Sequence, residues 1–228
     1  MARRLYPIFL DITDRLAVVV GGGQVAERKA LELLECRAQV RIVAPVATER
    51  LQSLAAEGRM EWLKRGFDPG DIDKAFMVFA ATGDRAINTR VCQACAYAGV
   101  IVNRVESPEA SDFLVPATLR RGQLTIAVST GAASPALAAE IRDGFARQFG
   151  AEYADYLALL GEARLKVMRE IADPQARRRV LLALAKDSSL LDVLRRDGEN
   201  RAKEHVETIV ARAAASAAEK EEKSHLSG

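Results

Sequence analysis

Three successive glycines, beginning at Gly21, stand between an apolar run and a segment typical of a helix. The apolar run at 16–20 predicts a buried parallel strand. Glycine lets the backbone turn tightly and approach a ligand closely, and the following helix offers free N–H groups to an anion. The spacing Gly21-x-Gly23-x-x-Ala26 therefore predicts the phosphate-binding turn of a dinucleotide-binding unit. The cofactor-binding residues predicted in this turn are Gly21, Gly23, Gln24 and Val25.

Strands and helices alternate through the first hundred residues, which is typical of a doubly wound α/β fold with a parallel sheet. The predicted strands are 7–12, 16–20, 39–43, 60–63, 76–80 and 100–102, and the predicted helices are 24–36, 47–57 and 86–98. Ligands of such sheets bind at the carboxyl ends of the strands. Two further loops at that edge add Pro45, Val46, Thr82 and Gly83 to the predicted cofactor site.

The pattern changes after residue 113. A strand at 113–118, a turn at 119–123 and a strand at 124–129 precede a helix with Ser134 as N-cap and Pro135 at its first position. Beyond residue 150 the apolar spacing predicts only helices. We therefore predict three parts: a Rossmann-type domain at 1–113, a small α+β dimerisation module at 114–150, and a helical domain at 151–228 that frays from 213.

Composition narrows the function further. The 228-residue chain is 49% hydrophobic with a net charge of +2, which argues against general nucleic-acid binding. It has no apolar run of about 18 residues and no recognisable signal peptide, so we expect no membrane partner. Three cysteines without an export signal favour the reducing cytoplasm. Because both histidines lie near the C-terminus and Cys92 and Cys95 form an isolated CxxC, we predict no bound metal.

A series of ordered motifs points to a family. The motifs are YPIFL (6–10), VGGGQVAERK (20–29), AATGD (80–84), NRVE (103–106), SDFLVPA (111–117), RGQLTIAVSTG (121–131) and SPALA (134–138). Together they resemble the precorrin-2 dehydrogenase family, the dehydrogenase and chelatase module of siroheme synthases. The resemblance implies NAD⁺-dependent oxidation of precorrin-2 to sirohydrochlorin by a homodimer. Some members also insert Fe²⁺ to make siroheme.

The resemblance also indicates where the acid–base chemistry lies. Loss of a hydride from the tetrapyrrole is accompanied by loss of a proton, which a carboxylate can accept or steer. The family has an aspartate at the end of an Asn-x-x-Asp motif, where this chain has the longer Glu106. Asp112 matches the family pattern in SDF (111–113). We predict Asp112 and Glu106 as the catalytic pair, with Asp112 first; the alternative is that Asp112 only orders its loop.

A substrate rich in carboxylates calls for cationic partners, and arginine binds carboxylates through paired hydrogen bonds. The substrate-binding residues that we predict are Arg104, Arg120, Arg121, Ser129 and Thr130, with Arg142 as a further arginine of the same kind.

The nucleotide preference and the activity each have an alternative. A conventional NAD site has an acidic residue after the second strand, but this chain has Val43 to Val46 there. The resemblance implies backbone contacts at that place and favours NAD, while Arg41 and Arg50 leave NADP open. Iron insertion in addition to oxidation is one alternative activity, and an NAD-sensing regulatory module without catalysis is another. The sequence has no second glycine-rich α/β domain, so we expect another protein to perform the methylation.

Overall fold

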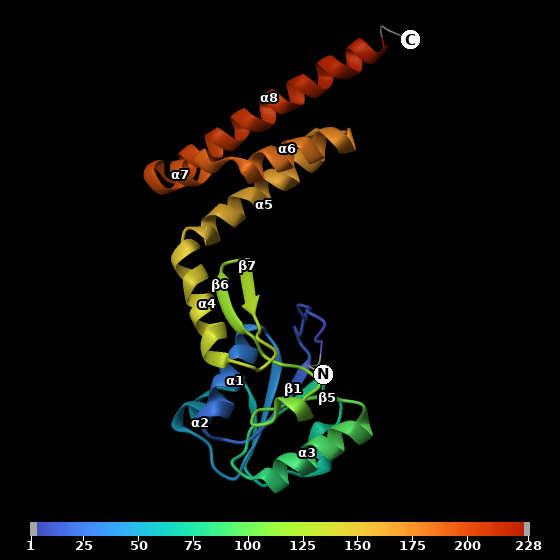
Figure 1. Cartoon of the computed structure of the whole chain (residues 1–228), viewed down its shortest axis with the longest axis vertical. Helices are drawn as coiled ribbons and strands as arrows, with labels where there is room; N and C mark the ends of the chain where they lie inside the picture. The colour runs from blue at the N-terminus through green and yellow to red at the C-terminus, as the bar shows by residue number, and fades with distance from the viewer. Residues whose placement is uncertain (1–3, 226–228) are drawn as a thin grey trace. The chain divides into compact units, whose positions relative to one another are not determined.

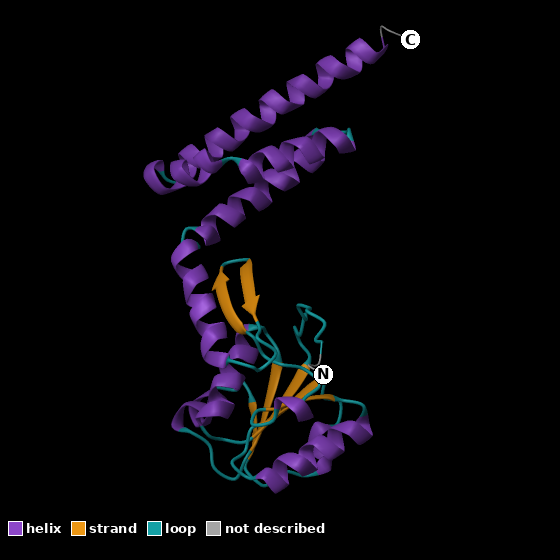
Figure 2. Cartoon of the chain, viewed as in Figure 1, coloured by secondary structure: helices purple, strands orange, loops and turns teal. Residues whose placement is uncertain are grey.

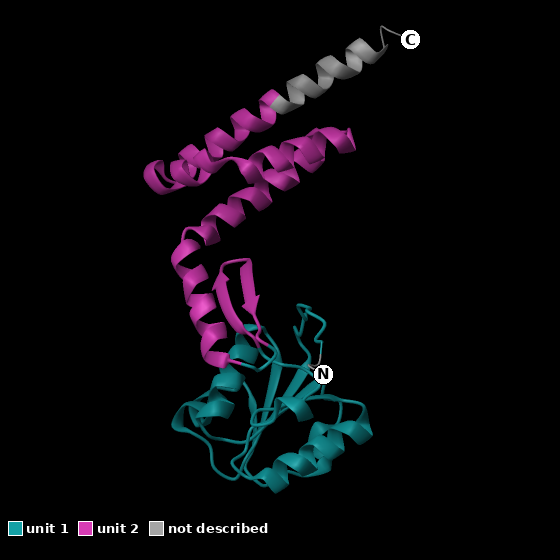
Figure 3. Cartoon of the chain, in the orientation of Figure 1, with its two compact units in different colours: residues 1–115, 131–133 teal, residues 116–130, 134–228 magenta. Residues whose placement is uncertain are grey.

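The computed structural model describes residues 4–225, with side chains as far as Arg212. The chain forms two compact units, coloured separately in Figure 3. The first unit contains residues 1–115 and 131–133, and the second contains 116–130 and 134–228. The predicted boundary at 113 falls two residues before the end of the first unit's main segment. The structure groups the predicted dimerisation module with the helical region, so a division at residue 150 stays a prediction.

The first unit is a Rossmann-type α/β domain (Figures 1 and 2). Its elements are β1 (Leu16–Val20), α1 (Gln24–Glu35), β2 (Gln39–Val43), α2 (Glu49–Ala56), β3 (Glu61–Leu63), η1 (Pro69–Ile72), β4 (Met77–Ala80), α3 (Arg85–Ala98), β5 (Ile101–Arg104) and η2 (Pro108–Ala110). All five strands are parallel, in the order β3-β2-β1-β4-β5. The predicted α/β class and parallel sheet are confirmed.

Alternating side chains of the central strands build two separate cores. Ala17 and Val19 of β1 pack in the cluster that contains the buried residues of α1 and α2. Val18 and Val20 pack in the cluster that contains the buried residues of α3. Because both faces of the sheet are covered, β1 and β4 consist of apolar residues throughout. This continuous apolar run made β1 recognisable in the sequence.

The N-terminal segment differs from its prediction. Residues 7–12, predicted as a strand, form no strand. Tyr6 and Phe9 are 87% and 73% exposed, so these apolar side chains lie outside the cores of the unit. The sheet ends at β3 and β5 without adding this segment. The apolar pattern of residues 7–12 predicted a strand, but it could not show whether a neighbouring strand would pair with this segment.

A buried carboxylate fixes the loop before β4. Arg65 donates to both oxygens of Asp71, and the backbone N–H of Asp68 donates to Oδ2 at 2.8 Å. Burial opposes ionisation of Asp71, but these hydrogen bonds outweigh it and lower its pKa. The carboxylate therefore stabilises the fold above its unfolded pKa of 3.8, and this contribution is lost as the pH falls through the still lower folded value.

Replacing this carboxylate is expected to destabilise the first unit at neutral pH. We expect Asp71→Asn to lower the free energy of unfolding by about 1–3 kcal/mol, because the Arg65 and Asp68 donors lose a charged acceptor. The loss in the free energy of unfolding is measured by urea unfolding at pH 7 and at a pH well below 3.8. The exposed Asp73 supplies the control, Asp73→Asn. A penalty that is the same at both pH values would contradict the ionic origin.

The second unit combines a β-hairpin with helices. Its elements are β6 (Ala117–Arg121), β7 (Leu124–Val128), α4 (Pro135–Gln148), α5 (Tyr153–Glu170), α6 (Pro174–Lys186), α7 (Ser188–Asp197) and α8 (Glu199–His225). The strands pair antiparallel with Leu119 opposite Ile126. The predicted strand at 113–118 was placed too early, and the turn is only Gly122 and Gln123. Gly122 has a φ of +55°, which favours glycine at the tight turn.

The helices of the second unit form a core of their own. Ser134 caps α4 by accepting from the Leu137 N–H at 3.2 Å, and Pro135 is its first residue, as predicted. Leu159, Val167, Val180, Leu184 and Leu190 are among the buried residues that join α5, α6, α7 and α8. We predicted that the chain frays from residue 213. The side chains from 213 onward, and residues 226–228 as a whole, lie outside the described part of the chain, so this stays a prediction. No described helix has the length and apolarity needed to cross a bilayer.

Candidate functional site

The carboxyl ends of β1 and β4 meet at the topological switch point of the sheet. From β1 the chain proceeds to β2 and β3 on one side, while β4 and β5 lie on the other. Open α/β sheets bind ligands in the crevice at this point. The predicted cofactor residues lie in the loops after β1, β2 and β4 and, for Gln24 and Val25, at the start of α1.

Two glycines of the turn are required by close backbone approaches. Gly21 has a φ of +134°, and a Cβ there would overlap the Ala81 carbonyl group after β4. A Cβ at Gly22 would overlap the Val46 carbonyl oxygen and lie 2.9 Å from the Ala44 Cβ. The sequence analysis identified Gly21 but missed Gly22, because the fingerprint treats that position as variable.

Gly23 differs from the other two because open space surrounds it. A Cβ there would meet no atom within 4 Å. Gly23 is the N-cap of α1, and its carbonyl accepts the Glu27 N–H at 2.9 Å. The N–H groups of α1 that come before Glu27 are therefore directed to the edge of the sheet where an anion can bind. An open cradle at a helix N-terminus fits the pyrophosphate of a dinucleotide.

The loop after β2 offers an exposed surface beside this turn. Pro45 is exposed and Val46 is 76% exposed, although both follow the buried Val43 and Ala44. The Trp62 indole donates to the Ala44 carbonyl at 3.0 Å and anchors the start of the loop. The Thr48 N–H donates to the Gly22 carbonyl at 2.9 Å, which joins the two loops. No carboxylate occupies residues 43–46 to bind a ribose.

A hydrogen-bond network connects the loop after β4 with Glu106. The Asn88 Oδ1 accepts from the Thr82 N–H at 3.2 Å and from its Oγ1 at 2.8 Å. The Asn88 Nδ2 donates to the Thr82 carbonyl at 3.0 Å and to Glu106 Oε2 at 2.6 Å. A predicted cofactor residue and a predicted catalytic residue are thus joined through Asn88. The sequence analysis missed Asn88, since an asparagine inside a helix has no distinguishing local pattern.

Glu106 is held as a carboxylate. Its Oε1 accepts from Arg104 Nε at 3.1 Å and from Nη2 at 3.0 Å. The hydrogen bond from Asn88 and those from Arg104 outweigh the cost of burial and lower the pKa of Glu106. The structure brings these two predicted residues together, with Arg104 paired to Glu106. A carboxylate held ionised can stabilise positive charge on a neighbouring molecule.

Asp112 has a backbone role at the edge of the sheet. Its N–H donates to the Val102 carbonyl at 2.8 Å, and its Oδ2 accepts the Val102 N–H at 2.9 Å. The Asn103 Nδ2 donates to the Phe113 carbonyl at 2.8 Å, which continues this pairing along β5. Asp112 therefore orders its loop, and a catalytic role beside this one stays a prediction. Its other oxygen, Oδ1, has no hydrogen bond among the described residues.

The remaining predicted substrate residues lie in the second unit. Arg121 donates from Nε to the Phe149 carbonyl at 3.2 Å. Thr130 Oγ1 accepts the Ser134 N–H at 3.1 Å and orders the turn before α4. Arg142 forms an ion pair with Asp143 at 2.6 Å. Arg120 is the neighbour of Arg121 in β6, and Ser129 follows β7. Contact of these residues with a substrate stays a prediction.

The thiols give no sign of a metal site. Cys36, Cys92 and Cys95 form no disulfide. Burial raises the pKa of Cys95 to about 12 and also raises that of Cys92, so both thiols stay protonated at neutral pH. Within the described residues, no group of three or more metal-ligating side chains could hold an ion.

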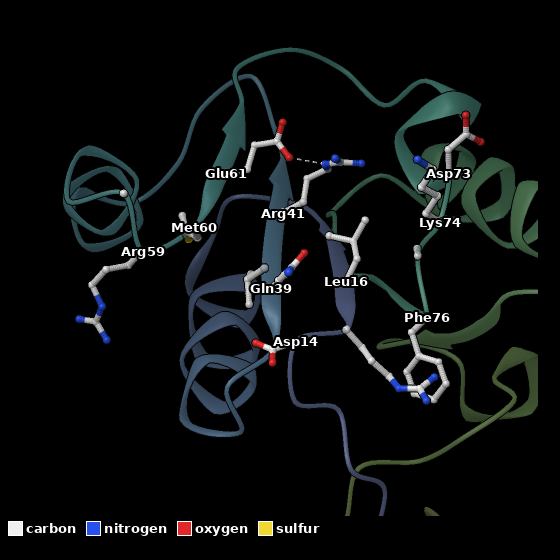
Figure 4. Close-up of a pocket in the computed structure, with 14 residues that line it drawn as sticks. Asp14, Leu16, Gln39, Arg41, Arg59, Met60, Glu61, Asp73, Lys74 and Phe76 are labelled. Carbon is white, nitrogen blue, oxygen red and sulfur yellow. Dashed lines mark hydrogen bonds and ion pairs between the residues drawn. The ribbon is translucent and has the colours of Figure 1, made fainter.

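A pocket of the first unit lies at the opposite edge of the sheet (Figure 4). This pocket of about 740 Å³ is lined by Leu16, Gln39 and Glu61, which are the first residues of β1, β2 and β3. Its charges are mixed, and Arg41 already pairs with Glu61 at 2.6 Å. The pocket is therefore separate from the carboxyl-edge site.

Comparisons with known proteins show which family and which relatives this chain is similar to. The model of a family described as putative NAD(P)-binding matches residues 8–117. The chain is 38% identical over 174 residues to siroheme synthase of Thioalkalivibrio sulfidiphilus, covering 76% of this chain and 36% of that protein. It is 32% identical over 205 residues to siroheme synthase 1 of Aeromonas salmonicida, covering 90% and 44%. The chain thus spans less than half the length of these curated relatives.

A solved structure matches most of the chain. The structure of SirC, a precorrin-2 dehydrogenase, superposes with a TM-score of 0.74 at 25% sequence identity. The match covers 90% of this chain and 98% of that one. It includes the helical region as well as the nucleotide-binding domain, since the first unit alone is too short to account for it.

Proposed function

We propose that this chain, a member of the precorrin-2 dehydrogenase family, oxidises precorrin-2 to sirohydrochlorin and transfers the hydride to NAD⁺. The observation that carries the proposal is the presence, at one sheet edge, of a dinucleotide-type glycine turn packed against the loop after β4 and of an ionised carboxylate that Asn88 joins to that loop. The likeness to SirC across 90% of the chain supports the choice of substrate.

The cradle after β1 fits the cofactor, with the N-terminus of α1 for its pyrophosphate and the exposed Pro45 and Val46 beside it. When bound, NAD⁺ accepts the hydride that the substrate loses. The tetrapyrrole loses two hydrogens, one as this hydride and one as a proton. Glu106, kept ionised by Asn88 and Arg104, stabilises the positive charge that hydride loss leaves, and the proton is released to solvent water.

The first test is an anaerobic assay of the purified chain. Precorrin-2 and NAD⁺ are mixed with the protein, and sirohydrochlorin and NADH are followed together, with NADP⁺ in a parallel reaction. Equal amounts of both products that depend on NAD⁺ are expected. Tight nucleotide binding without turnover with either nucleotide would contradict the dehydrogenase and favour the NAD-sensing module.

Three finer proposals accompany this activity. The chain works as a homodimer in the reducing cytoplasm, supported by exposed Leu137 and Ile141 on α4 and by three cysteines that form no disulfide. Light scattering after size exclusion measures the mass.

Iron insertion is tested by adding Fe²⁺ to sirohydrochlorin under the same conditions, with siroheme formation as the readout. Siroheme that forms at the uncatalysed rate would restrict the chain to oxidation.

A further inference from the structure

We propose that Asn88 is a positioning residue that couples the nucleotide-contacting loop at Thr82 to the Glu106 carboxylate. This inference rests on the function proposed above and assigns a role to a residue outside the predicted site. Asn88 lies in the first turn of α3, whose helix is capped by Asp84 through the Ala86 and Ile87 N–H groups. The cap fixes the start of the helix and therefore the place of the Asn88 side chain.

The Asn88 side chain is fully buried and fully satisfied. Its exposed fraction is 0%, and the amide makes four hydrogen bonds, two as acceptor and two as donor. These equal the hydrogen-bonding capacity of an asparagine side chain. The partners also determine the orientation of the amide, since the Thr82 N–H must face Oδ1, and the Thr82 carbonyl and the Glu106 carboxylate must face Nδ2. A buried amide is costly unless satisfied, and an apolar residue could fill the same volume.

The arrangement makes one side chain sensitive to both ends of the site. A shift of Thr82 on nucleotide binding moves the N–H that donates to Asn88 Oδ1 and the carbonyl that accepts from Asn88 Nδ2. The same Nδ2 holds Glu106 Oε2, so the position of the carboxylate follows the loop. The other charged and titratable groups around Glu106 are Arg104 on β5, Arg85 and Cys92 on α3, and Asp112 near Cys92.

The decisive variant is Asn88→Asp, which keeps the shape and both Thr82 donors but places a carboxylate opposite Glu106. Two adjacent carboxylates cannot both ionise without a large cost, so one takes up a proton. NAD⁺ affinity by titration calorimetry and kcat are measured from pH 5 to 9. In the variant, NAD⁺ affinity and kcat are expected to fall together by about fivefold or more as the pH rises and that proton is lost. The wild type should show no such shared transition.

The control is Thr89→Ala, one residue further on α3, where the exposed hydroxyl bonds only to the Arg85 carbonyl of its own helix. It should match the wild type in both measurements. If Asn88→Asp does not fold, Glu106→Gln tests the same coupling, and about fivefold weaker NAD⁺ binding is expected. A change in melting temperature alone, or a kcat transition without any change in NAD⁺ affinity, would overturn the coupling. Because NAD⁺ binding is measured without turnover, failure of the proposed activity is distinguished from failure of the coupling.

Discussion

Gly22→Ala is expected to lower the free energy of unfolding by about 2–3 kcal/mol, because the added methyl group enters a space occupied by backbone. The Val46 carbonyl oxygen would overlap the new Cβ, and the Ala47 Cα would lie 3.0 Å away. Backbone atoms cannot move aside as the end of a flexible side chain can. Denaturant unfolding of the wild type and the variant, followed by far-ultraviolet circular dichroism, measures the loss.

Gly23→Ala is the matched comparison in the same turn. Its added Cβ meets open space, and the residue has a φ of −84° that alanine adopts freely. We expect stability within about 0.5 kcal/mol of the wild type. NAD⁺ affinity should fall, because the methyl group enters the space left for the pyrophosphate. Equal stability of the two variants would contradict the steric role of Gly22, and unchanged affinity in Gly23→Ala would contradict the placement of the nucleotide.

Glu106→Gln is expected to reduce kcat by about a hundredfold or more, because the side chain keeps its size but loses its charge. Glu106 is partly exposed at the carboxyl edge, so the fold should tolerate the change. Steady-state kinetics with precorrin-2 and NAD⁺ separate kcat from KM. A variant with wild-type kcat would remove Glu106 from the mechanism.

Asp112 supplies the counterpart, since a conservative change can keep its structural bond. In Asp112→Asn the amide oxygen can still accept the Val102 N–H, and we expect stability and kcat close to wild type. In Asp112→Ala the Val102 N–H loses its partner, which costs about 1–3 kcal/mol. A fall in kcat for Asp112→Asn as large as for Glu106→Gln would restore Asp112 as the first catalytic carboxylate.

Local patterns predicted the parts of the fold that depend on neighbours in the sequence. The apolar run of β1 and the glycines after it lie within eight residues of one another, so their spacing alone indicated a strand, a turn and a helix. The N-cap Ser134 was predictable for the same reason.

Contacts between distant segments could not be predicted in this way. The requirement for Gly22 comes from Val46 on the next loop, and the role of Asn88 depends on Glu106, 18 residues away. Asp112 was recognised as a carboxylate, but its bond to Val102 depends on how the loop after η2 returns to β5. These residues became distinctive only after the chain folded and brought their partners together.

The anchoring of the β2 loop by Trp62 gives the protein an intrinsic optical reporter. Trp62 is the only tryptophan of the chain, and its indole bonds directly to the carbonyl that precedes Pro45. Lys64 lies over the same ring at 5.3 Å. Emission from a single indole comes from one known place, so a spectral change on adding a nucleotide can be assigned to this loop without any label. Stopped-flow fluorescence could then time the arrival of the cofactor separately from the oxidation that follows.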